Sequence, residues 1–246
     1  MTGASSRNKR FYERVWGSQD VVDYRLWSTW PLINRLAPKR ALEIGCGNKP
    51  RIPVAGNYFL DINSGAVDRL DKAGGKALVF DLSTKLPFEV GQFDLVCAFE
   101  VMEHLKDDRK MMAEIARVLS KTGTALISFP LNMKYWADYD AKVGHVRRYE
   151  PRDLGAFFGQ AGFSIDRYAV VKVPWPNGWQ SRLLIFLVDY FPGVLASVQG
   201  WLESRGESPL RTKLYLRNWT EGSADNLREE TTALFILKKR NDRGGF

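Results

Sequence analysis

Short apolar runs, separated by turn residues and longer amphipathic stretches, follow one another along the chain from residue 41 onward. Five of these runs are too short for helices and are bounded by glycine, proline or polar residues, which favours β-strands. They are ALEI (41–44), YFLD (58–61), ALVF (77–80), FDLVCAF (93–99) and TALISF (124–129). Between the last two, the stretch at 107–120 places Met111, Ile115 and Val118 on one helical face. Strands that alternate with helices predict a parallel sheet covered on both faces.

The pattern before and after these runs extends the same architecture. Aromatic and aliphatic residues recur at roughly helical intervals over 7–36 and predict an amphipathic helix ahead of the sheet. PRDLGAFFGQAGF (151–163) predicts a further helix, with proline early and glycine near its end. IDRYAVVKV (165–173) and TALFILKKR (232–240) predict the last two strands. We therefore expect a Rossmann-like α/β fold with a seven-stranded, mostly parallel sheet whose last strand is antiparallel.

Three parts make up the expected domain organisation. A helical N-terminal segment occupies 1–40, the core occupies 41–173 and 230–241, and a helical insertion occupies 174–229. The insertion holds the most apolar stretch of the protein, but Asp189 and Pro192 interrupt it, so it is too short to span a membrane. Two short helices forming a lid over an acceptor pocket are one interpretation. Its tryptophans and nearby arginines favour another, in which 174–211 contacts a membrane surface peripherally.

The charge balance points to an anionic partner without naming it. The formal net charge is +8, which suits nucleic acid, a lipid headgroup surface or an acidic small molecule. The basic residues are scattered apart from Lys238, Lys239 and Arg240, and no RNA-binding aromatic signature accompanies them. A solvated basic surface is therefore favoured over a nucleic-acid interface.

Cysteine usage and the first residues of the chain bear on location. Cys46 and Cys97 form neither a disulfide framework nor a zinc-ligand spacing, so reduced thiols are expected. The first sixteen residues lack the apolar stretch of a signal peptide. Both observations predict a cytoplasmic protein.

Candidate binding residues gather where the predicted strands end. The first strand runs into EIGCG (43–47), where glycine lets backbone N–H groups approach a ligand without obstruction by a Cβ atom. The second strand ends in Asp61, an acid that can accept hydrogen bonds from both hydroxyls of a ribose. The third is followed by Asp81 and the fourth by FEVMEHL (99–105). In a parallel sheet, these strand ends share one edge.

The succession of motifs over 41–130 resembles the class I S-adenosylmethionine-dependent methyltransferases. It is most similar to the type 11 branch, which includes ubiquinone-biosynthesis and other small-molecule methyltransferases, and GHVRRYEPRDLGAFFGQAGF (144–163) is also similar to that branch. The resemblance implies an enzyme that uses S-adenosyl-L-methionine and releases S-adenosyl-L-homocysteine. It implies a small-molecule or lipid-linked acceptor, with O-methylation as the first expectation.

The same resemblance implies a role for each motif residue. Glu43 and the glycines would shape the pocket for the methionine part, Asp61 would hold the ribose, and Asp81 would take the adenine amino group. The complete expected set of cofactor-binding residues is Glu43, Gly45, Cys46, Gly47, Asp61, Ile62, Asp81, Leu82, Phe99 and Glu100.

One feature departs from the family pattern. Only about ten residues separate Gly47 from the second strand, and they include Pro50 and Pro53, so the usual crossover helix must be a single turn or missing. The same stretch argues against a dinucleotide-dependent dehydrogenase, because GCGNKP carries Pro50 where that fingerprint needs its third glycine.

Methyl transfer needs few catalytic groups, because the methyl group is already activated by its bond to the sulfonium, so the enzyme mainly positions the acceptor. A general base is needed only if the acceptor loses a proton, and the expected catalytic residues are His145, Glu100 and His104. His145 is expected as base or acceptor ligand. Arg147, Arg148 and Tyr149 are expected to bind the acceptor, an arginine contacting an anionic group.

Two questions stay open at this point. Glu100, Glu103 and His104 match the spacing of the metal-binding trio of ubiquinone-type O-methyltransferases, but metal-free relatives keep the Glu-His pair as well, and we expect no metal. The alternatives to a small-molecule enzyme are a nucleic-acid or protein methyltransferase, which the basic charge supports, and a non-catalytic protein that binds S-adenosylmethionine.

Overall fold

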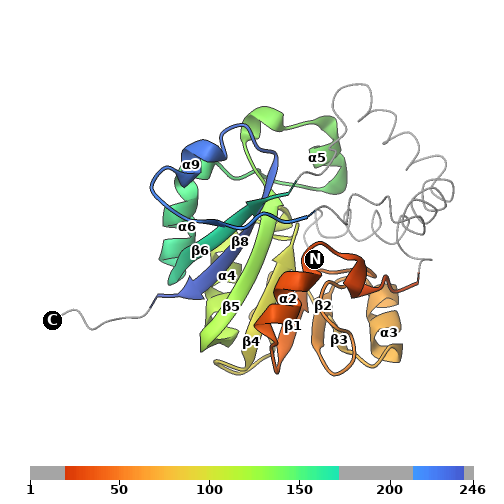
Figure 1. Cartoon of the computed structure of the whole chain (residues 1–246). Helices are drawn as coiled ribbons and strands as arrows, with labels where there is room; N and C mark the ends of the chain where they lie inside the picture. Colours follow the sequence, from red (N-terminus) through yellow and green to blue (C-terminus); the bar gives the residue numbers. More distant parts are fainter. Residues whose placement is uncertain (1–19, 172–212, 241–246) are drawn as a thin grey trace.

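The computed structural model describes residues 20–171 and 213–240, and these form one twisted sheet with helices on both faces (Figure 1). Its eight strands lie in the order β3-β2-β1-β4-β5-β8-β6-β7. Their bounds are β1 Ala41–Ile44, β2 Tyr58–Asp61, β3 Lys76–Val79, β4 Phe93–Phe99, β5 Leu119–Pro130, β6 Phe163–Val170, β7 Arg217–Asn218 and β8 Thr232–Lys239.

Strand direction follows the prediction. β1 to β5 pair in parallel, whereas β8 enters between β5 and β6 and is antiparallel to both. The sheet has eight strands rather than the predicted seven, because the two-residue β7 pairs with the edge of β6 through Arg167↔Asn218 and Tyr168↔Arg217. Both residues of β7 are exposed, so no apolar pattern in the sequence marks it.

The α-helices of the described residues are short. They are α2 Trp30–Leu36, α3 Ser64–Lys72, α4 Asp108–Val118, α5 Asp138–Val143, α6 Leu154–Gln160 and α9 Ser223–Asn226. Single 3-10 turns, labelled η, occupy Tyr24–Leu26, Met102–His104, Met133–Tyr135 and Pro151–Asp153. Residues 45–57 contain no helix, so the predicted loss of the crossover helix after the glycine turn is confirmed.

Within the described residues, the expected N-terminal helical segment is divided into two short helical pieces, and its first nineteen residues lie outside the description. Between 20 and 36, the 3-10 turn at Tyr24–Leu26 ends before α2 begins at Trp30. The Asp23 side chain caps that turn by accepting a hydrogen bond from the Arg25 backbone N–H at 2.9 Å. Pro31 lies in the first turn of α2, where its missing N–H carries no penalty. Asp23 and Pro31 therefore each mark the beginning of a separate helical piece, although the apolar residues recur at helical intervals through both.

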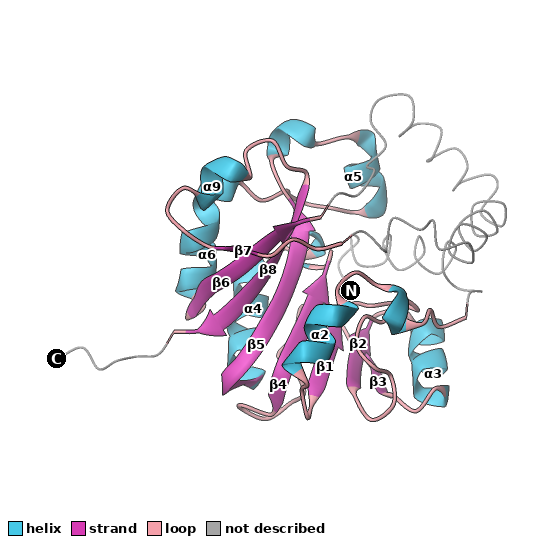
Figure 2. Ribbon diagram, viewed as in Figure 1, coloured by secondary structure: helices cyan, strands magenta, loops and turns pink. Residues whose placement is uncertain are grey.

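Each face of the sheet carries its own apolar core, and helices lie on both faces (Figure 2). α4 and α6 cover one face, where Met111, Ile115 and Val118 of α4 are buried as predicted. α2 covers part of the other face through Leu32 and Ile33. Because β1 to β5 pair in parallel, their carboxyl ends meet at one edge of the sheet.

Residues 174–212 of the predicted insertion lie outside the described residues, and so do the interpretations of this stretch as a lid or as a membrane contact. The described remainder supplies β7 and the four-residue α9. No helix within 20–171 or 213–240 has the length and apolar composition that crossing a bilayer requires.

Candidate functional site

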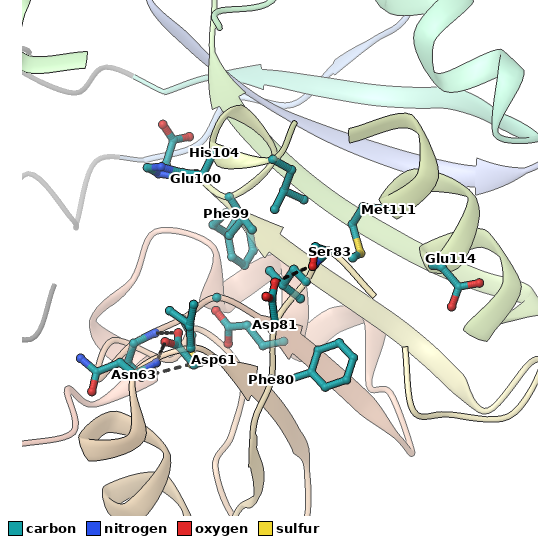
Figure 3. Close-up of a pocket in the computed structure, with 18 of the residues that line it drawn as sticks. Asp61, Asn63, Phe80, Asp81, Ser83, Phe99, Glu100, His104, Met111 and Glu114 are labelled. Atoms are coloured by element: carbon teal, nitrogen blue, oxygen red, sulfur yellow. Dashed lines mark hydrogen bonds between the residues drawn. The ribbon is translucent and has the colours of Figure 1, made fainter. Parts of the chain in front are cut away.

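A cavity of about 570 Å³ opens beside the carboxyl ends of β1, β2, β3 and β4. This volume lies within the range that small-molecule and cofactor sites occupy. All ten residues that the sequence predicts for cofactor binding line it, and so does His104. Figure 3 shows Asp61 and Asp81 near the ends of two neighbouring strands, and Glu100 beside His104 at the end of a third.

The glycine turn after β1 forms one wall of the cavity. Gly45 and Gly47 have φ values of +70° and +55°, which favour glycine. A Cβ atom on Gly45 would lie 2.6 Å from Cγ2 of Val101, so the space beside it is already filled. The Gly47 N–H donates to Oδ2 of Asp61 at 2.7 Å and thereby ties the turn to the end of β2.

Asp61 is held from two sides. Its Oδ1 accepts a hydrogen bond from the Asn63 N–H at 2.8 Å, while Oδ2 accepts from Gly47. Burial raises the pKa of this carboxyl and the backbone hydrogen bonds lower it. Each carboxylate oxygen can accept more than one hydrogen bond, so Asp61 keeps acceptor capacity toward the cavity.

Asp81 lies one strand further along the same edge. Its Oδ1 accepts a hydrogen bond from the Ser83 N–H at 2.9 Å in a tight turn, and Thr84 Oγ1 donates to its backbone carbonyl. Phe80 and Leu82 flank it, line the cavity and pack against the apolar core. An acidic side chain between apolar neighbours suits a planar base that carries an amino group.

The loop that replaces the crossover helix brings a cation to the cavity, which the sequence did not reveal. Glu43 is buried, and its Oε2 accepts from the backbone N–H groups of Arg51 and Ile52 at 2.8 and 3.2 Å. Burial raises the pKa of Glu43 to about 7. The guanidinium carbon of Arg51 lies 4.4 Å from the ring centroids of both Trp27 and Phe99. Nothing in the sequence marks Trp27 as a neighbour of this loop.

Glu100 occupies a strained position at the end of β4. Its φ is +55°, although it is not glycine, and such outliers cluster at functional sites. Oε1 accepts a hydrogen bond from Ser128 Oγ at 2.7 Å, whereas Oε2 is buried without a hydrogen-bond partner among the described residues. Burial raises the pKa of this carboxyl.

Beside Glu100, two histidines converge on the fully buried Glu103. The Nε2 atoms of His145 and His104 lie 3.6 and 3.9 Å from Glu103 Oε1. Nδ1 of His145 contacts Asp140 Oδ1 at 2.8 Å, and Nδ1 of His104 contacts the Gly144 carbonyl at 3.3 Å. Burial lowers the pKa of His104 to about 3, so its ring is neutral near pH 7. A neutral ring that donates through Nδ1 presents the lone pair of Nε2 to Glu103.

Glu103, His104 and His145 could hold a divalent metal ion. Their ligand atoms lie within 4.8 Å of one another, and both oxygens of Glu103 are buried without a hydrogen-bond partner in the described part of the chain. Carboxylate and imidazole ligands suit several divalent ions, and Asp140 lies behind His145 as an orienting group. The grouping differs from the trio that the resemblance implied, because His145 stands where Glu100 was expected.

The expected acceptor-binding residues lie outside the cavity lining and have partners of their own. Arg148 donates to both oxygens of the buried Asp140 at 2.9 Å, and Arg147 pairs with Asp108 at 2.6 Å. Tyr149 donates to Asp108 at 2.7 Å, and its ring stacks on Phe129. His145 is also buried and outside the lining. The sequence shows a basic run here but not the acids that lie opposite it.

Comparison with known proteins agrees with this geometry. Residues 42–127 match the family model described as "Methyltransferase domain". A probable S-adenosylmethionine-dependent methyltransferase of Mycobacterium tuberculosis is 26% identical over 163 residues, which cover 61% of this chain and 60% of that protein. Ajmaline N-methyltransferase of Rauvolfia serpentina is 24% identical over 206 residues, covering 71% of this chain and 69% of that protein.

A solved structure extends the likeness to the fold. The O-methyltransferase of a trans-AT PKS multienzyme of Brevibacillus brevis, in complex with S-adenosyl-L-homocysteine, superposes with a TM-score of 0.54 at 16% identity. The match covers 87% of this chain and 71% of that one. The predicted Rossmann-like fold is thereby confirmed.

Proposed function

We propose that residues 42–127, which match a methyltransferase domain, are of the class I S-adenosylmethionine-dependent type, and that the chain transfers the methyl group of S-adenosyl-L-methionine to a small-molecule or lipid-linked acceptor. The observation that carries the proposal is the single cavity at which the glycine turn, Asp61 and Asp81 meet. S-adenosyl-L-homocysteine is the product. A small-molecule acceptor is supported by the alkaloid N-methyltransferase among the relatives.

In this proposal, residues at the ends of different strands bind the adenine, the ribose and the methionine part of the cofactor. Asp81 accepts a hydrogen bond from the adenine amino group, and Asp61 accepts from the ribose hydroxyls. The glycine turn and Glu43 border the methionine part. Because the methyl group is already bonded to a sulfonium, holding the acceptor in line with it supplies much of the rate enhancement.

Glu100 is the residue we propose as general base. The residue lines the cavity, its Oε2 has no hydrogen-bond partner among the described residues, and burial raises its pKa, which brings it nearer to the operating pH. The base would remove the proton of an acceptor hydroxyl, and we therefore propose O-methylation before N-methylation.

His104 and His145 have different places in the proposal. His104 lines the cavity and contacts the acceptor, whereas His145 acts from behind it by fixing the ring of His104, whose centroid lies 4.7 Å away. A divalent ion held by Glu103, His104 and His145 would polarise an acceptor oxygen when bound. The base chemistry of Glu100 does not depend on that ion.

Transfer of a labelled methyl group from S-adenosylmethionine to a panel of phenols, carboxylic acids, amines and lipid-linked acceptors tests the proposal. We expect turnover on hydroxyl-bearing members, and Asp61→Ala serves as the control that loses it. Cofactor binding without turnover on any member would favour a non-catalytic binding protein. Label transferred to RNA or protein instead would contradict the small-molecule assignment.

We also propose peripheral membrane contact through 174–211, supported by the sequence of that stretch and by the net charge of +8. Co-sedimentation with vesicles of anionic and of purely zwitterionic lipid tests it. Binding to the anionic vesicles that is lost on deletion of 174–211 is expected. The absence of binding to either kind would contradict the contact.

A further inference from the structure

We propose that Arg51 binds the carboxylate of the cofactor's methionine part and that the helix-free loop after the glycine turn exists in this chain to deliver it. The inference rests on the proposed function, because it concerns the same cofactor. It goes further by assigning a recognition residue to the loop in which this chain departs from the family pattern.

The side chain of Arg51 is positioned before any ligand arrives. Its guanidinium carbon lies 4.4 Å from the centroid of Trp27 and 4.4 Å from that of Phe99. Trp27 comes from the turn before α2 and Phe99 from the end of β4, so two separate elements hold the group. Contact with aromatic faces stabilises a cation and limits its rotamers, which lowers the entropy lost on binding.

The backbone of Arg51 is fixed as well. Its N–H donates to Glu43 Oε2 at 2.8 Å, and the neighbouring Ile52 is fully buried. The guanidinium itself makes no hydrogen bond or ion pair of its own with any residue in 20–171 or 213–240, although Arg51 lines the cavity. A fork of N–H donors held in place and facing a cavity is suited to bidentate binding of a carboxylate.

The charges around the glycine turn explain why a cation is needed there. Glu43, Asp61 and Glu100 line this part of the cavity, and they suit the ammonium and sulfonium groups of the cofactor. The same acids would repel its carboxylate. Arg51, whose charge acts on both Glu43 and Glu100, offsets that repulsion. Lys106 and Lys110 also line the cavity, but Lys110 belongs to the first turn of α4 and Lys106 to the turn just before that helix.

Two ligands that differ only in the carboxylate test the inference without any mutation. Isothermal titration of the wild-type chain with S-adenosylhomocysteine and with its decarboxylated analogue, S-adenosyl-3-thiopropylamine, gives the ratio of the two dissociation constants. We expect the carboxylate to strengthen binding by about 10- to 100-fold, as for a charged hydrogen-bond pair. Equal affinities would overturn the inference and leave the proposed function standing.

Variants identify the residue responsible. Arg51→Gln should bring the two dissociation constants to within about threefold of each other, because it weakens the binding of S-adenosylhomocysteine alone. Arg51→Lys should retain part of the difference between the two ligands. Arg35→Gln, which removes an exposed charge from α2, is the matched control and should leave the ratio unchanged. Thermal unfolding of each variant checks that it is folded.

Lys49 lies in the same loop and lines the same cavity, so it is the competing cation. A ratio that collapses in Lys49→Gln but persists in Arg51→Gln would overturn the inference. Equal weakening of both ligands by Arg51→Gln would overturn it too, because Arg51 would then only shape the pocket. If neither ligand bound the wild-type chain, the proposed function would fail, and this inference with it.

Discussion

At the scale of single residues, the site contains carboxyl groups whose burial opposes their ionisation, Glu43 in the cavity lining and Glu103 outside it. Glu43 and Glu103 are nearly or fully inaccessible to solvent, and burial is the largest cause of the raised pKa of each. A proton or a bound cation stabilises such groups, because either one offsets the cost of a buried negative charge. The pH dependence of stability and of ligand binding therefore reports the protonation of these carboxyl groups.

Glu43 makes a prediction about stability. The pKa of Glu43 is about 7 in the folded chain, against its ordinary value of 4.5. Between these two pH values the folded state binds more protons than the unfolded state, so the free energy of unfolding falls as the pH rises through 7. The loss attributable to Glu43 is about 3 kcal/mol at most. Chemical denaturation at pH 4.5 and at pH 8 measures it. Glu43→Gln should lose less stability over this interval than the wild type, and an identical loss in both proteins would contradict the shift.

Glu100 makes a prediction about turnover. Glu100→Gln keeps the size of the side chain and its contact with Ser128 but removes the base, so turnover should fall by about 100-fold or more. The dissociation constant for S-adenosylhomocysteine should change by less than about threefold, because the base acts on the acceptor rather than on the cofactor. Turnover close to that of the wild type would remove Glu100 from the role of base.

His145 tests the positioning role. His145→Ala removes the ring that packs against His104 and should lower turnover by about tenfold while sparing cofactor affinity. His145→Gln, which can still donate to Asp140, should recover part of the loss. Steady-state kinetics and calorimetry on the same preparations measure both quantities. Unchanged turnover in the alanine variant would discard the role.

At the scale of elements, the strands and their ends were the most predictable features of the chain. β1, β2 and β4 begin and end as predicted, because each is a short apolar run closed by turn residues. β5 starts earlier, at Leu119, where a bulge separates its first pairing with β4 from the rest. Because strand ends of a parallel sheet share an edge, the sequence alone suffices to group at one cavity the ten residues that it predicts for cofactor binding.

The sequence could not predict which side chains of distant elements form ion pairs or cation–π contacts with one another. Arg148 was expected at the acceptor, yet its guanidinium lies against Asp140 in α5. Arg51 was not singled out, because its neighbours Trp27 and Phe99 are remote in sequence. The spacing of apolar residues predicts which face of a helix or strand is buried, but it does not predict which charged side chains pair with one another.

The glycine turn after β1 makes the prediction that belongs to this scale. Gly45→Ala places a methyl group 2.6 Å from Val101 Cγ2 at a φ of +70°, so we expect a loss of about 1–3 kcal/mol of stability and weaker cofactor binding. Adding Val101→Ala should recover the part due to crowding but not the part due to φ. Thermal unfolding of the single and double variants separates the two. Wild-type stability in Gly45→Ala would contradict the geometry of the turn.

At the scale of the whole molecule, the sheet places the proposed contacts with the cofactor together at the carboxyl ends of its parallel strands. The helices α4 and α6 on one face and α2 on the other hold the strands in that alignment (Figure 2). The family match covers the glycine turn, Asp61, Asp81 and Glu100 but not the described residues that follow β5.

The central claim is that Asp61 and Asp81 hold one adenosyl group beside the glycine turn. Calorimetric titration with S-adenosylhomocysteine of the wild type, Asp61→Ala and Asp81→Ala tests it most directly. We predict one site per chain in the wild type and affinities lowered by about tenfold or more in each variant, since each loses hydrogen bonds to a charged group. No heat of binding in the wild type, or unchanged affinity in both variants, would contradict the account.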